Sequence, residues 1–401
     1  MTAEAVDVKG LRALLVSSVL PRDTTGGEVV LHRYLSQWEA LHLVIATNNS
    51  QSLLAEDSVD VKPNSLLTRL TKTRLSRWAH DIRQCFYPFY NCNQLRDYIQ
   101  HNQPDLILTV AHGELCWIAQ QMSVQFKIPL VTFFHDWWPD LAYVHDWARA
   151  RITHRFQRLY QQSQLALCVS EGMRQALETH SNAQVLFPIP DKSMIVTTTE
   201  NLPYEGKFKV IYAGIMTGLY SSMLQNLYRA LQESSEIQLE LFGPQPDWSE
   251  PLLQQVKTEG VYAGFIPREV LTSKLNQAHG LLVVMSFDPR DKTRMQTSFP
   301  SKLVDYCQFG KPIVIWGPNY CSAVQWGRQY QSALVVTSPF AKDLVQAIRE
   351  LATQPEKQNY LGNKALDRAK GMFNPEKIQQ QFIDALSKVA TLSKGEPQVV
   401  F

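Results

Sequence analysis

The segment FFHDWWPD places a histidine, an aspartate and two tryptophans directly after an apolar run. The run before them, IPLVTFF, is rich in β-branched and aromatic residues, which indicates a buried strand. His135 and Asp136 are therefore candidate catalytic residues, because an imidazole there can change protonation near neutral pH. Trp137 and Trp138 could line the edge of a ligand site or fill the rim of a core. The alternative is a histidine satisfied at a strand end beside two core tryptophans.

A second chemically equipped segment is SFPSKLVDYCQFGKPIVIW, residues 298–316. We expect Ser301 to cap a helix whose first N–H groups can bind a phosphate, with Lys302 adding positive charge. Asp305, one turn further on, can accept hydrogen bonds from a ribose. Gly310 is expected to end the helix before the next buried strand. An ordinary capped helix without a ligand explains Ser301 equally well.

A third segment, residues 67–91, is basic and aromatic. Four apolar residues share one face of its predicted helix: Leu75, Trp78, Ala79 and Ile82. Its charged residues are Arg69, Lys72, Arg74, Arg77 and Arg83, against the single acid Asp81. A basic amphipathic helix of this kind fits a peripheral membrane contact or a site for a lipid-linked acceptor. A solvated surface helix with an ordinary core face explains the pattern equally well.

The elements that must position these residues follow from the apolar runs. Six runs of strand length precede residue 191 and six more follow residue 205, alternating with helical patterns. This alternation predicts an α/β protein with parallel sheets covered on both faces. We expect two Rossmann-like domains, at 1–190 and 205–375, joined by a polar linker, and a helix at 376–394 that packs back on the first. Ligands of such sheets bind beyond the carboxyl ends of the strands, here in a cleft between the domains.

Composition narrows the class of protein. The 401 residues suit two domains, and a net charge of +2 does not indicate a nucleic-acid partner. The six cysteines lack metal-ligand spacing and are expected to be reduced. The N-terminus MTAEAVDVKG resembles neither a signal peptide nor a membrane span, and no run reaches the roughly 18 apolar residues of a span. We therefore expect a cytoplasmic protein, with peripheral contact at the inner membrane face left open by residues 67–91.

The run PSKLVDY followed by GKP resembles the donor-site segment of bacterial family-4 glycosyltransferases of the GT-B fold. SSVLPRDTTGGEVVLHRYL is similar to the first strand and Gly-Gly loop of that family, where Gly26 and Gly27 would let the backbone approach a sugar nucleotide. CVSEGMRQAL is similar to its Ser-Glu-x-Met helix start, a mainly structural feature. VYAGFI matches the strand whose end packs on the nucleobase. The resemblance further implies that His135 contacts the transferred sugar or the donor phosphate.

Two departures from the family pattern concern the donor. Thr297 stands eight positions before Asp305, where the family commonly has a glutamate. The stretch YAGIMTGLYSSML lacks the arginine and lysine that commonly neutralise the diphosphate. Arg290, Lys292 and Arg294, in the predicted loop DPRDKTRMQTSFPSK, could replace that charge. A solvated loop is the alternative for the first two.

The resemblance implies a hexosyltransferase that moves a sugar from a UDP- or GDP-sugar to a hydroxyl of a glycan, lipid-linked or small-molecule acceptor. It further implies retention of configuration, independence of metals and cofactors, and a role in polysaccharide or glycoconjugate biosynthesis. The catalytic candidates are His135, Asp136 and Lys302, and the acceptor candidates are Trp137, Trp138 and His112. The donor candidates are Gly26, Gly27, Gly214, Gly264, Phe265, Ile266, Arg294, Thr297, Ser298, Phe299, Pro300, Ser301, Lys302 and Asp305.

Two other functions fit the same sequence. A nucleotide-sugar epimerase would bind the same donor but needs acids against a sugar C–H bond, and no convincing pair stands out. A degenerate protein that binds a nucleotide or a partner without catalysis would explain Thr297 and the missing cations after Gly214.

Overall fold

The computed structural model describes residues 10–24, 26–48, 58–86, 90–194 and 206–395. The chain divides into two compact units. The first comprises Met1–Phe187 with Gln379–Phe401, and the second comprises Pro188–Ile378. The expected N-terminal segment, most of the expected linker and the C-terminal tail lie outside the described residues, as do residues 87–89.

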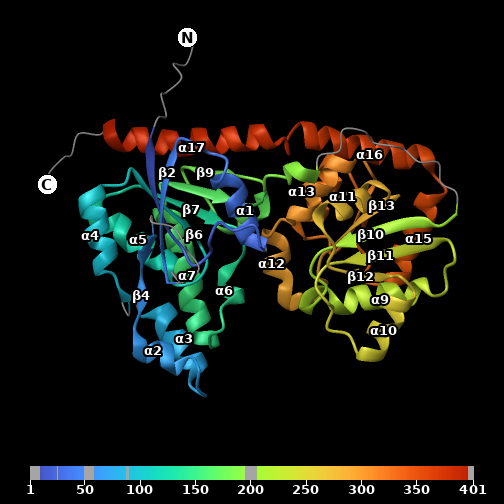
Figure 1. The fold of residues 1–401 in the computed structure, drawn as a ribbon, viewed down its shortest axis with the longest axis horizontal. Helices are drawn as coiled ribbons and strands as arrows, with labels where there is room; N and C mark the ends of the chain where they lie inside the picture. The colour runs from blue at the N-terminus through green and yellow to red at the C-terminus, as the bar shows by residue number, and fades with distance from the viewer. Residues whose placement is uncertain (1–9, 25, 49–57, 87–89, 195–205, 396–401) are drawn as a thin grey trace, which may run out of the picture. The chain divides into compact units, whose positions relative to one another are not determined.

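The first unit is built on a parallel seven-stranded sheet with the order β3-β2-β1-β6-β7-β8-β9 (Figure 1). Its strands are β1 (Leu11–Val16), β2 (Leu41–Thr47), β3 (Ser58–Asp60), β6 (Leu106–Val110), β7 (Leu130–Phe134), β8 (Leu165–Cys168) and β9 (Ala183–Val185). Every residue of β6 and β7 is buried, as their continuous apolar sequences predict. A short antiparallel pair joins β4 (Lys62–Pro63) to β5 (Tyr90–Asn91).

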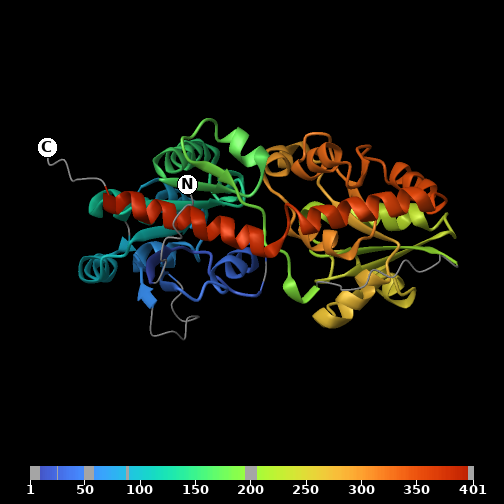
Figure 2. The ribbon, with the colours of Figure 1, turned by 90° about the horizontal axis from the view of Figure 1, so that it is seen from above.

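Helices cover both faces of this sheet (Figure 2). They are α1 (Gly26–Leu35), α2 (Ser65–Leu70), α3 (Ser76–Cys85), α4 (Asn93–Asn102), α5 (Leu115–Phe126), α6 (Trp138–Leu141), α7 (Asp146–Gln162), α8 (Glu171–Ala176) and the part of α17 (Pro375–Gly395) from Gln379 onward. Phe382 of α17 packs on Tyr34 and Phe133, with ring centroids 5.3 and 5.8 Å apart. The last helix is thus held by the core of the first unit.

The second unit holds a parallel six-stranded sheet with the order β12-β11-β10-β13-β14-β15. Its strands are β10 (Phe208–Ala213), β11 (Ile237–Phe242), β12 (Tyr262–Gly264), β13 (Gly280–Val284), β14 (Ile313–Trp316) and β15 (Leu334–Val336). Its helices are α9 (Ser221–Leu231), α10 (Glu250–Thr258), α11 (Arg268–Asn276), α12 (Lys292–Thr297), α13 (Ser301–Tyr306), α14 (Ser322–Tyr330), α15 (Ala341–Ala352) and α16 (Pro355–Lys370). All six strands match predicted apolar runs.

Strand order points to one place in each sheet. The order reverses between β1 and β6 in the first unit and between β10 and β13 in the second. In doubly wound sheets, ligands bind beyond the carboxyl ends of the strands at such reversals. Among the described residues, no helix is long and apolar enough to cross a membrane.

Candidate functional site

The carboxyl edge of the first sheet gathers His135 and Gly27, which are far apart in sequence. His135 follows β7, and Gly27 lies in the first turn of α1. A Cβ built on Gly27 would lie 3.6 Å from His135 Nδ1, so the backbone of α1 lines the imidazole. Both glycines belong to the helix itself and not to a loop before it, and Gly26 has a φ of +48°. The predicted Gly-Gly loop is therefore the first turn of α1.

Burial keeps the two histidines of this edge uncharged at neutral pH. Desolvation lowers the pKa of His135 to about 4, an effect that Asp136 opposes and His112 reinforces. Burial also lowers the pKa of His112, against the opposing charges of Asp136 and Glu114. The expectation that His135 titrates near neutral pH is therefore wrong for the free protein. His135 Nδ1 is buried and makes no hydrogen bond within the described part of the chain.

The two tryptophans after His135 have different surroundings. Trp137 is only 8% exposed and packs edge-on against Phe156 of the core, with ring centroids 5.2 Å apart. The prediction that Trp137 contacts an acceptor is wrong in this structure, and the core alternative describes it. Trp138 is partly exposed and lies against His112, with ring centroids 4.1 Å apart. Its Nε1 is buried without a hydrogen-bond partner among the described residues.

Sequence reasoning missed Ser18, a third polar group at this edge. Ser18 follows β1, and its Oγ is buried without a partner within the described ranges. A Cβ on Gly113, which follows β6 with a φ of +74°, would come within 2.8 Å of that oxygen. The position of Ser18 just after the first strand was the available signal. Ser18 Oγ, His135 Nδ1 and Trp138 Nε1 thus form a set of hydrogen-bonding atoms that the described protein leaves unused.

At the carboxyl edge of the second sheet, three strand ends are closed by glycines. Gly214 N donates to Phe242 O at 2.9 Å, and Gly243 N donates to Gly264 O at 2.9 Å. A Cβ on Gly243 would clash with the Gly214 carbonyl, so only glycine fits there. Gly214 itself has a φ of +146°, and a Cβ there would clash with Lys302 Nζ. The backbone and the lysine are therefore in close approach.

Lys302 is the outstanding charged residue of this edge. Its Nζ lies 3.9 Å from the ring centroid of Tyr212, and it makes no hydrogen bond or ion pair within the described residues. Burial lowers the pKa of Lys302 to about 7, although the side chain as a whole is partly exposed. A cation held by packing but left without a counter-charge is arranged to receive an anion.

The helix that carries Lys302 differs from expectation. Pro300, not Ser301, occupies the N-cap position of α13, and no side chain caps the helix. Ser301 is its first residue, and α13 continues for only six residues before a 3₁₀ turn that ends at Gly310 in a left-handed conformation. The prediction that Ser301 is the cap is wrong.

Asp305 is anchored by the segment that precedes the second sheet. Its Oδ1 accepts a hydrogen bond from the backbone N–H of Asp191 at 2.8 Å. Asp191 in turn pairs with Arg268, with 3.3 Å between Nη1 and Oδ2. Asp305 is thus held against the segment that precedes β10.

Several predicted donor contacts are turned into the protein instead. DPRDKTRMQTSFPSK is not all loop, because residues 292–297 form α12. Thr297 is fully buried, and its hydroxyl donates to Thr293 O at 2.8 Å. Phe299 is buried against Trp326 and Phe373, with ring centroids 6.4 and 6.1 Å away. Neither Thr297 nor Phe299 presents its side chain for a ligand, so the hydroxyl contact expected of Thr297 is wrong in this conformation. A donor contact through the backbone N–H of Phe299 stays a prediction.

The three cations of this segment differ in their partners. Arg290 pairs with Asp288 at 2.6 Å, and Lys292 lies 5.7 Å from the Tyr320 ring centroid. Both side chains are exposed, as the solvated alternative expects, but Lys292 is the first residue of α12 and not part of a loop. Arg294 is partly exposed and makes no ion pair among the described residues. It stays a candidate.

The remaining predicted residues lie near the surface. Ser298 and Pro300 are partly exposed, and the Ser298 carbonyl accepts a hydrogen bond from the Ser322 hydroxyl. Phe265, directly after β12, has 80% of its surface exposed. Gly264 before it has a φ of +74°, and Ile266 after it is partly exposed. An exposed aromatic ring beyond a strand end is suited to stack on a planar ligand.

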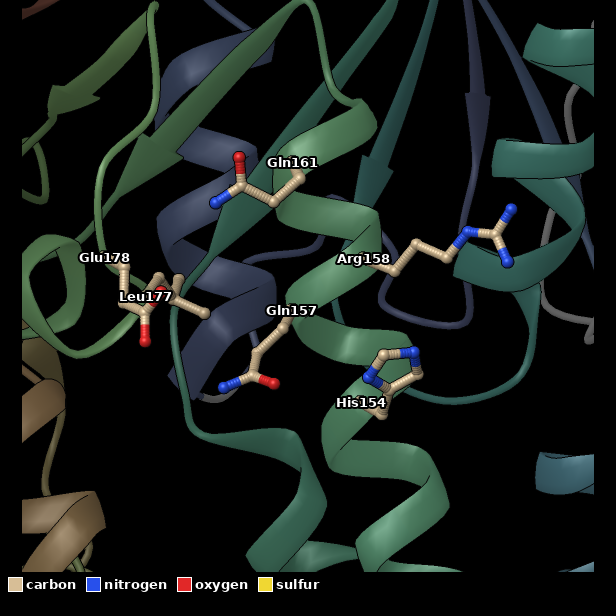
Figure 3. Close-up of a pocket in the computed structure, with 6 residues that line it drawn as sticks. All are labelled: His154, Gln157, Arg158, Gln161, Leu177 and Glu178. Carbon is tan, nitrogen blue, oxygen red and sulfur yellow. The ribbon is translucent and has the colours of Figure 1, made fainter.

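Two further features bear on the site. Within the ranges that the structure describes, no group of three or more His, Cys, Asp or Glu residues could hold a metal ion. A surface pocket of about 460 Å³ lies on the first unit (Figure 3). It is lined by His154, Gln157, Arg158 and Gln161 of α7 and by Leu177 and Glu178. None of these was a predicted site residue.

Comparisons with known proteins agree with this architecture. Residues 24–186 match the model of Glycosyltransferase Family 4. No curated protein matches the chain. Among solved structures, Anabaena Alr3699/HepE in complex with UDP and glucose is 16% identical, with a TM-score of 0.64, over 94% of this chain and 99% of that one. A glycosyltransferase from Rickettsia africae is 12% identical, with a TM-score of 0.65, over 95% and 98%.

The same fold also carries other chemistry. A UDP-N-acetylglucosamine 2-epimerase is 11% identical, with a TM-score of 0.54, over 98% of this chain and 100% of that one. Likeness at these identities establishes the fold, while the family match lies within the first unit. The comparisons therefore show the GT-B fold, together with a match to the Glycosyltransferase Family 4 model over residues 24–186.

Proposed function

We propose that this protein transfers a sugar from a nucleotide-diphosphate donor to an acceptor hydroxyl. The observation that carries the proposal is the ammonium group of Lys302, held against Gly214 and Tyr212 at the strand reversal of the second sheet. It lacks a counter-ion among the described residues, and a diphosphate would supply one. The family-4 match supports the same reaction class from the first unit.

Donor binding assigns a role to each well-placed residue of the second unit. Lys302 binds the diphosphate, and Arg294 adds a second positive charge. Phe265 stacks on the nucleobase, and Asp305 accepts a hydrogen bond from the ribose. The Anabaena protein was solved with UDP and with UDP-glucose, so UDP-sugars are the first donors to test, and GDP-sugars are the second.

The transfer step needs stabilisation of the leaving diphosphate. The bond from the anomeric carbon to the diphosphate breaks, a bond to the acceptor oxygen forms, and the acceptor proton is released. Negative charge develops on the diphosphate, and a preorganised cation is the most effective way to stabilise it. Lys302 supplies that charge, so we propose a metal-independent reaction. Retention of configuration is proposed from the family resemblance.

The first unit is proposed to bind the transferred sugar and the acceptor. Neutral His135 contacts the transferred hexose, and Asp136 lies next to it in the chain. Ser18, His112 and Trp138 provide the edge against which an acceptor hydroxyl is held. The acceptor class is a glycan, a lipid-linked molecule or a small molecule, in polysaccharide or glycoconjugate synthesis.

A two-step experiment tests the proposal. Purified protein is first screened for thermal stabilisation by nucleotide-sugars, since a ligand at 100 times its Kd adds about 2.7 kcal/mol. Donors that bind are then incubated with the protein, and nucleoside diphosphate and sugar products are separated by chromatography. The proposal predicts release of UDP or GDP from wild type and loss of release in Lys302→Gln. Lys342→Gln, an exposed lysine of α15, serves as the control.

Two other outcomes identify the rival functions. An isomerised nucleotide-sugar without nucleotide release indicates an epimerase, the alternative that the likeness to a solved epimerase keeps open. Binding without any product indicates a protein that only senses the donor. Failure of every nucleotide-sugar to bind overturns the proposal.

A further inference from the structure

One end of the first unit carries an exposed surface of large apolar and basic side chains, where α3 meets the start of α7 (lower part of Figure 1). We call it the aromatic–basic surface. Its apolar members are Leu75, Trp78, Phe86, Tyr143 and Trp147, which are between 46% and 62% exposed. Its exposed basic members are Arg69, Lys72, Arg74 and Arg151.

The helix α3, at the centre of this surface, buries polar side chains and exposes a large apolar one. The buried residues of α3 are Ala79, Asp81, Gln84 and Cys85, two of which are polar. Leu75 just before the helix and Trp78 within it are instead 53% and 52% exposed. An ordinary surface helix buries its largest apolar side chains, so the core face that α3 forms with Ala79 and Cys85 does not explain the exposure of Leu75 and Trp78.

Ring contacts join three of the aromatic side chains, Trp78, Phe86 and Trp147, into one continuous patch. The ring centroid of Trp147 lies 6.2 Å from that of Trp78 and 6.5 Å from that of Phe86. Trp78 in turn lies against His145, at 4.7 Å. The guanidinium of Arg151 lies 5.4 Å from the Phe86 ring centroid. One of the exposed cations, Arg151, is therefore in contact with the aromatic patch.

Buried polar contacts hold the patch in place from below. Asp81 is fully buried and accepts a hydrogen bond from the backbone N–H of His145 at 2.8 Å, while its second oxygen lies 2.5 Å from His145 Nδ1. Arg77 donates to Val144 O at 2.8 Å. These contacts tie α3 to the segment before α7. The backbone segments that carry the exposed rings are thus held together by buried hydrogen bonds.

The charge of the surface is one-sided. Asp81, the single acid of residues 67–91, is buried and paired with His145. Arg83 is turned inward, with its Nε 3.1 Å from Glu114 Oε1. Asp146, at the start of α7, is an exposed acid next to Trp147, and Asp140 of α6 is exposed as well. The exposed basic members of the surface outnumber these two acids. The surface therefore complements a negatively charged partner that also accepts apolar rings.

We propose that the aromatic–basic surface binds the interface of a bilayer that contains anionic lipids. Tryptophan and tyrosine are the side chains that settle at the boundary of headgroups and acyl chains. Basic side chains next to them are attracted to the negative surface potential of anionic lipids. The contact is peripheral, because it uses side chains of short helices. It does not rest on the glycosyltransferase proposal.

Vesicle co-sedimentation of the full chain tests the proposal. Vesicles are made of phosphatidylcholine alone or with phosphatidylglycerol, at low and high salt. The aromatic variant is Trp78→Ser with Trp147→Ser, and the basic variant is Lys72→Gln with Arg74→Gln. The matched control is Phe340→Ser with Lys342→Gln, an exposed aromatic–lysine pair of the second unit. Circular dichroism melting confirms that each variant is folded.

The proposal predicts that wild type and the control bind anionic vesicles, and that binding weakens at high salt. The basic variant should bind roughly 25-fold more weakly, at about fivefold for each cation. The aromatic variant should lose binding to a similar or larger extent at both salt concentrations. No binding by wild type, equal binding to neutral and anionic vesicles, or folded variants that bind like wild type would each overturn it. The first of these results would assign the surface to a protein partner.

Discussion

The carboxyl edges of the two sheets offer opposite kinds of polar group. The first presents uncharged atoms, namely Ser18 Oγ, His135 Nδ1 and Trp138 Nε1, which lack partners among the described residues. The second presents a cation, Lys302, packed against glycine backbone. The carboxyl edges of the two sheets therefore carry different chemistry. Uncharged donors and acceptors suit sugar hydroxyls, and a cation suits a diphosphate.

Burial acts on both edges and has different consequences. It lowers the pKa of His135 to about 4, so this imidazole is neutral at pH 7. It lowers the pKa of Lys302 to about 7, so this ammonium is only partly charged in the free protein at that pH. An arriving diphosphate would restore the full charge of the lysine. The charge of His135 is thus constant near neutral pH, whereas the charge of Lys302 would change when a ligand binds.

The largest expected effect is on catalysis at the first edge. His135→Ala should lower kcat by about 100-fold or more, because its contact to the transferred sugar is lost. The melting temperature should stay nearly unchanged at pH 7, since His135 Nδ1 forms no hydrogen bond within the described chain. Nucleotide release and thermal melting give the two numbers. A large fall in melting temperature with a matching fall in activity would return His135 to a core role.

The next effect concerns pH at the second edge. Bound UDP should raise the Lys302 pKa above its free value of about 7. Between these two values, binding takes up a proton, so UDP affinity should fall as pH rises above 7, by at most tenfold per pH unit. Calorimetry in buffers of different ionisation enthalpy measures the proton uptake directly. Affinity that is flat between pH 7 and 9 would remove Lys302 from the phosphate site.

The same pKa shift has a second, opposite consequence for the free protein. Lys302 holds fewer protons in the folded chain than in the unfolded chain between pH 7 and 10.5. Its contribution to the free energy of unfolding should therefore rise with pH in this window. Denaturant melts of wild type and Lys302→Gln at pH 7 and 9 should differ in their pH dependence.

A pair of glycine substitutions sharpens the comparison between the edges. A Cβ at Gly214 would clash with Lys302 Nζ, whereas a Cβ at Gly27 would meet His135 Nδ1 at an ordinary 3.6 Å. Gly214→Ala should therefore weaken UDP binding by roughly tenfold, through displacement of the ammonium. Gly27→Ala should leave UDP binding intact and reduce turnover only. If both variants lose UDP affinity equally, the division between the edges is wrong.

The smallest effect is expected at Asp305. Asp305→Asn keeps the oxygen that accepts from Asp191 N but removes the charge that would hold the ribose. Ribose contacts are alike in ground and transition states, so KM should rise roughly fivefold with kcat little changed. Steady-state kinetics with a UDP-sugar separates the two constants. An equal fall in kcat and kcat/KM would place Asp305 closer to the reacting bond.

Much of the fold could be predicted from the sequence because parallel strands bury both faces. Runs such as LILTV and IVIW are continuously apolar, and they became β6 and β14. The short edge strand β3, Ser58–Asp60, was missed because a half-exposed edge strand of three residues carries little apolar signal. The start of α17 at Pro375 and its buried apolar face follow from the Asn-Pro signal and the helical period.

The site was less predictable, because contacts between distant segments decide it. Gly27 and His135 are separated by more than a hundred residues, and sequence alone does not say that one lines the other. Thr297 was expected in a loop, but α12 turned its hydroxyl back onto Thr293. The period of α3 showed an apolar face, yet it did not show that Trp78 on that face is exposed. In each case the sequence indicated the local element or residue type, but it did not show which distant residues would pack against it.

The most direct test of the central claim is calorimetry of UDP and of uridine with wild type and Lys302→Gln. If Lys302 binds the diphosphate, the variant should bind UDP roughly 10- to 150-fold more weakly, the range of one charge-assisted hydrogen bond. Its affinity for uridine should stay the same. Equal losses for UDP and uridine, or no loss for either in a folded variant, would contradict the assignment of the second edge as the diphosphate site.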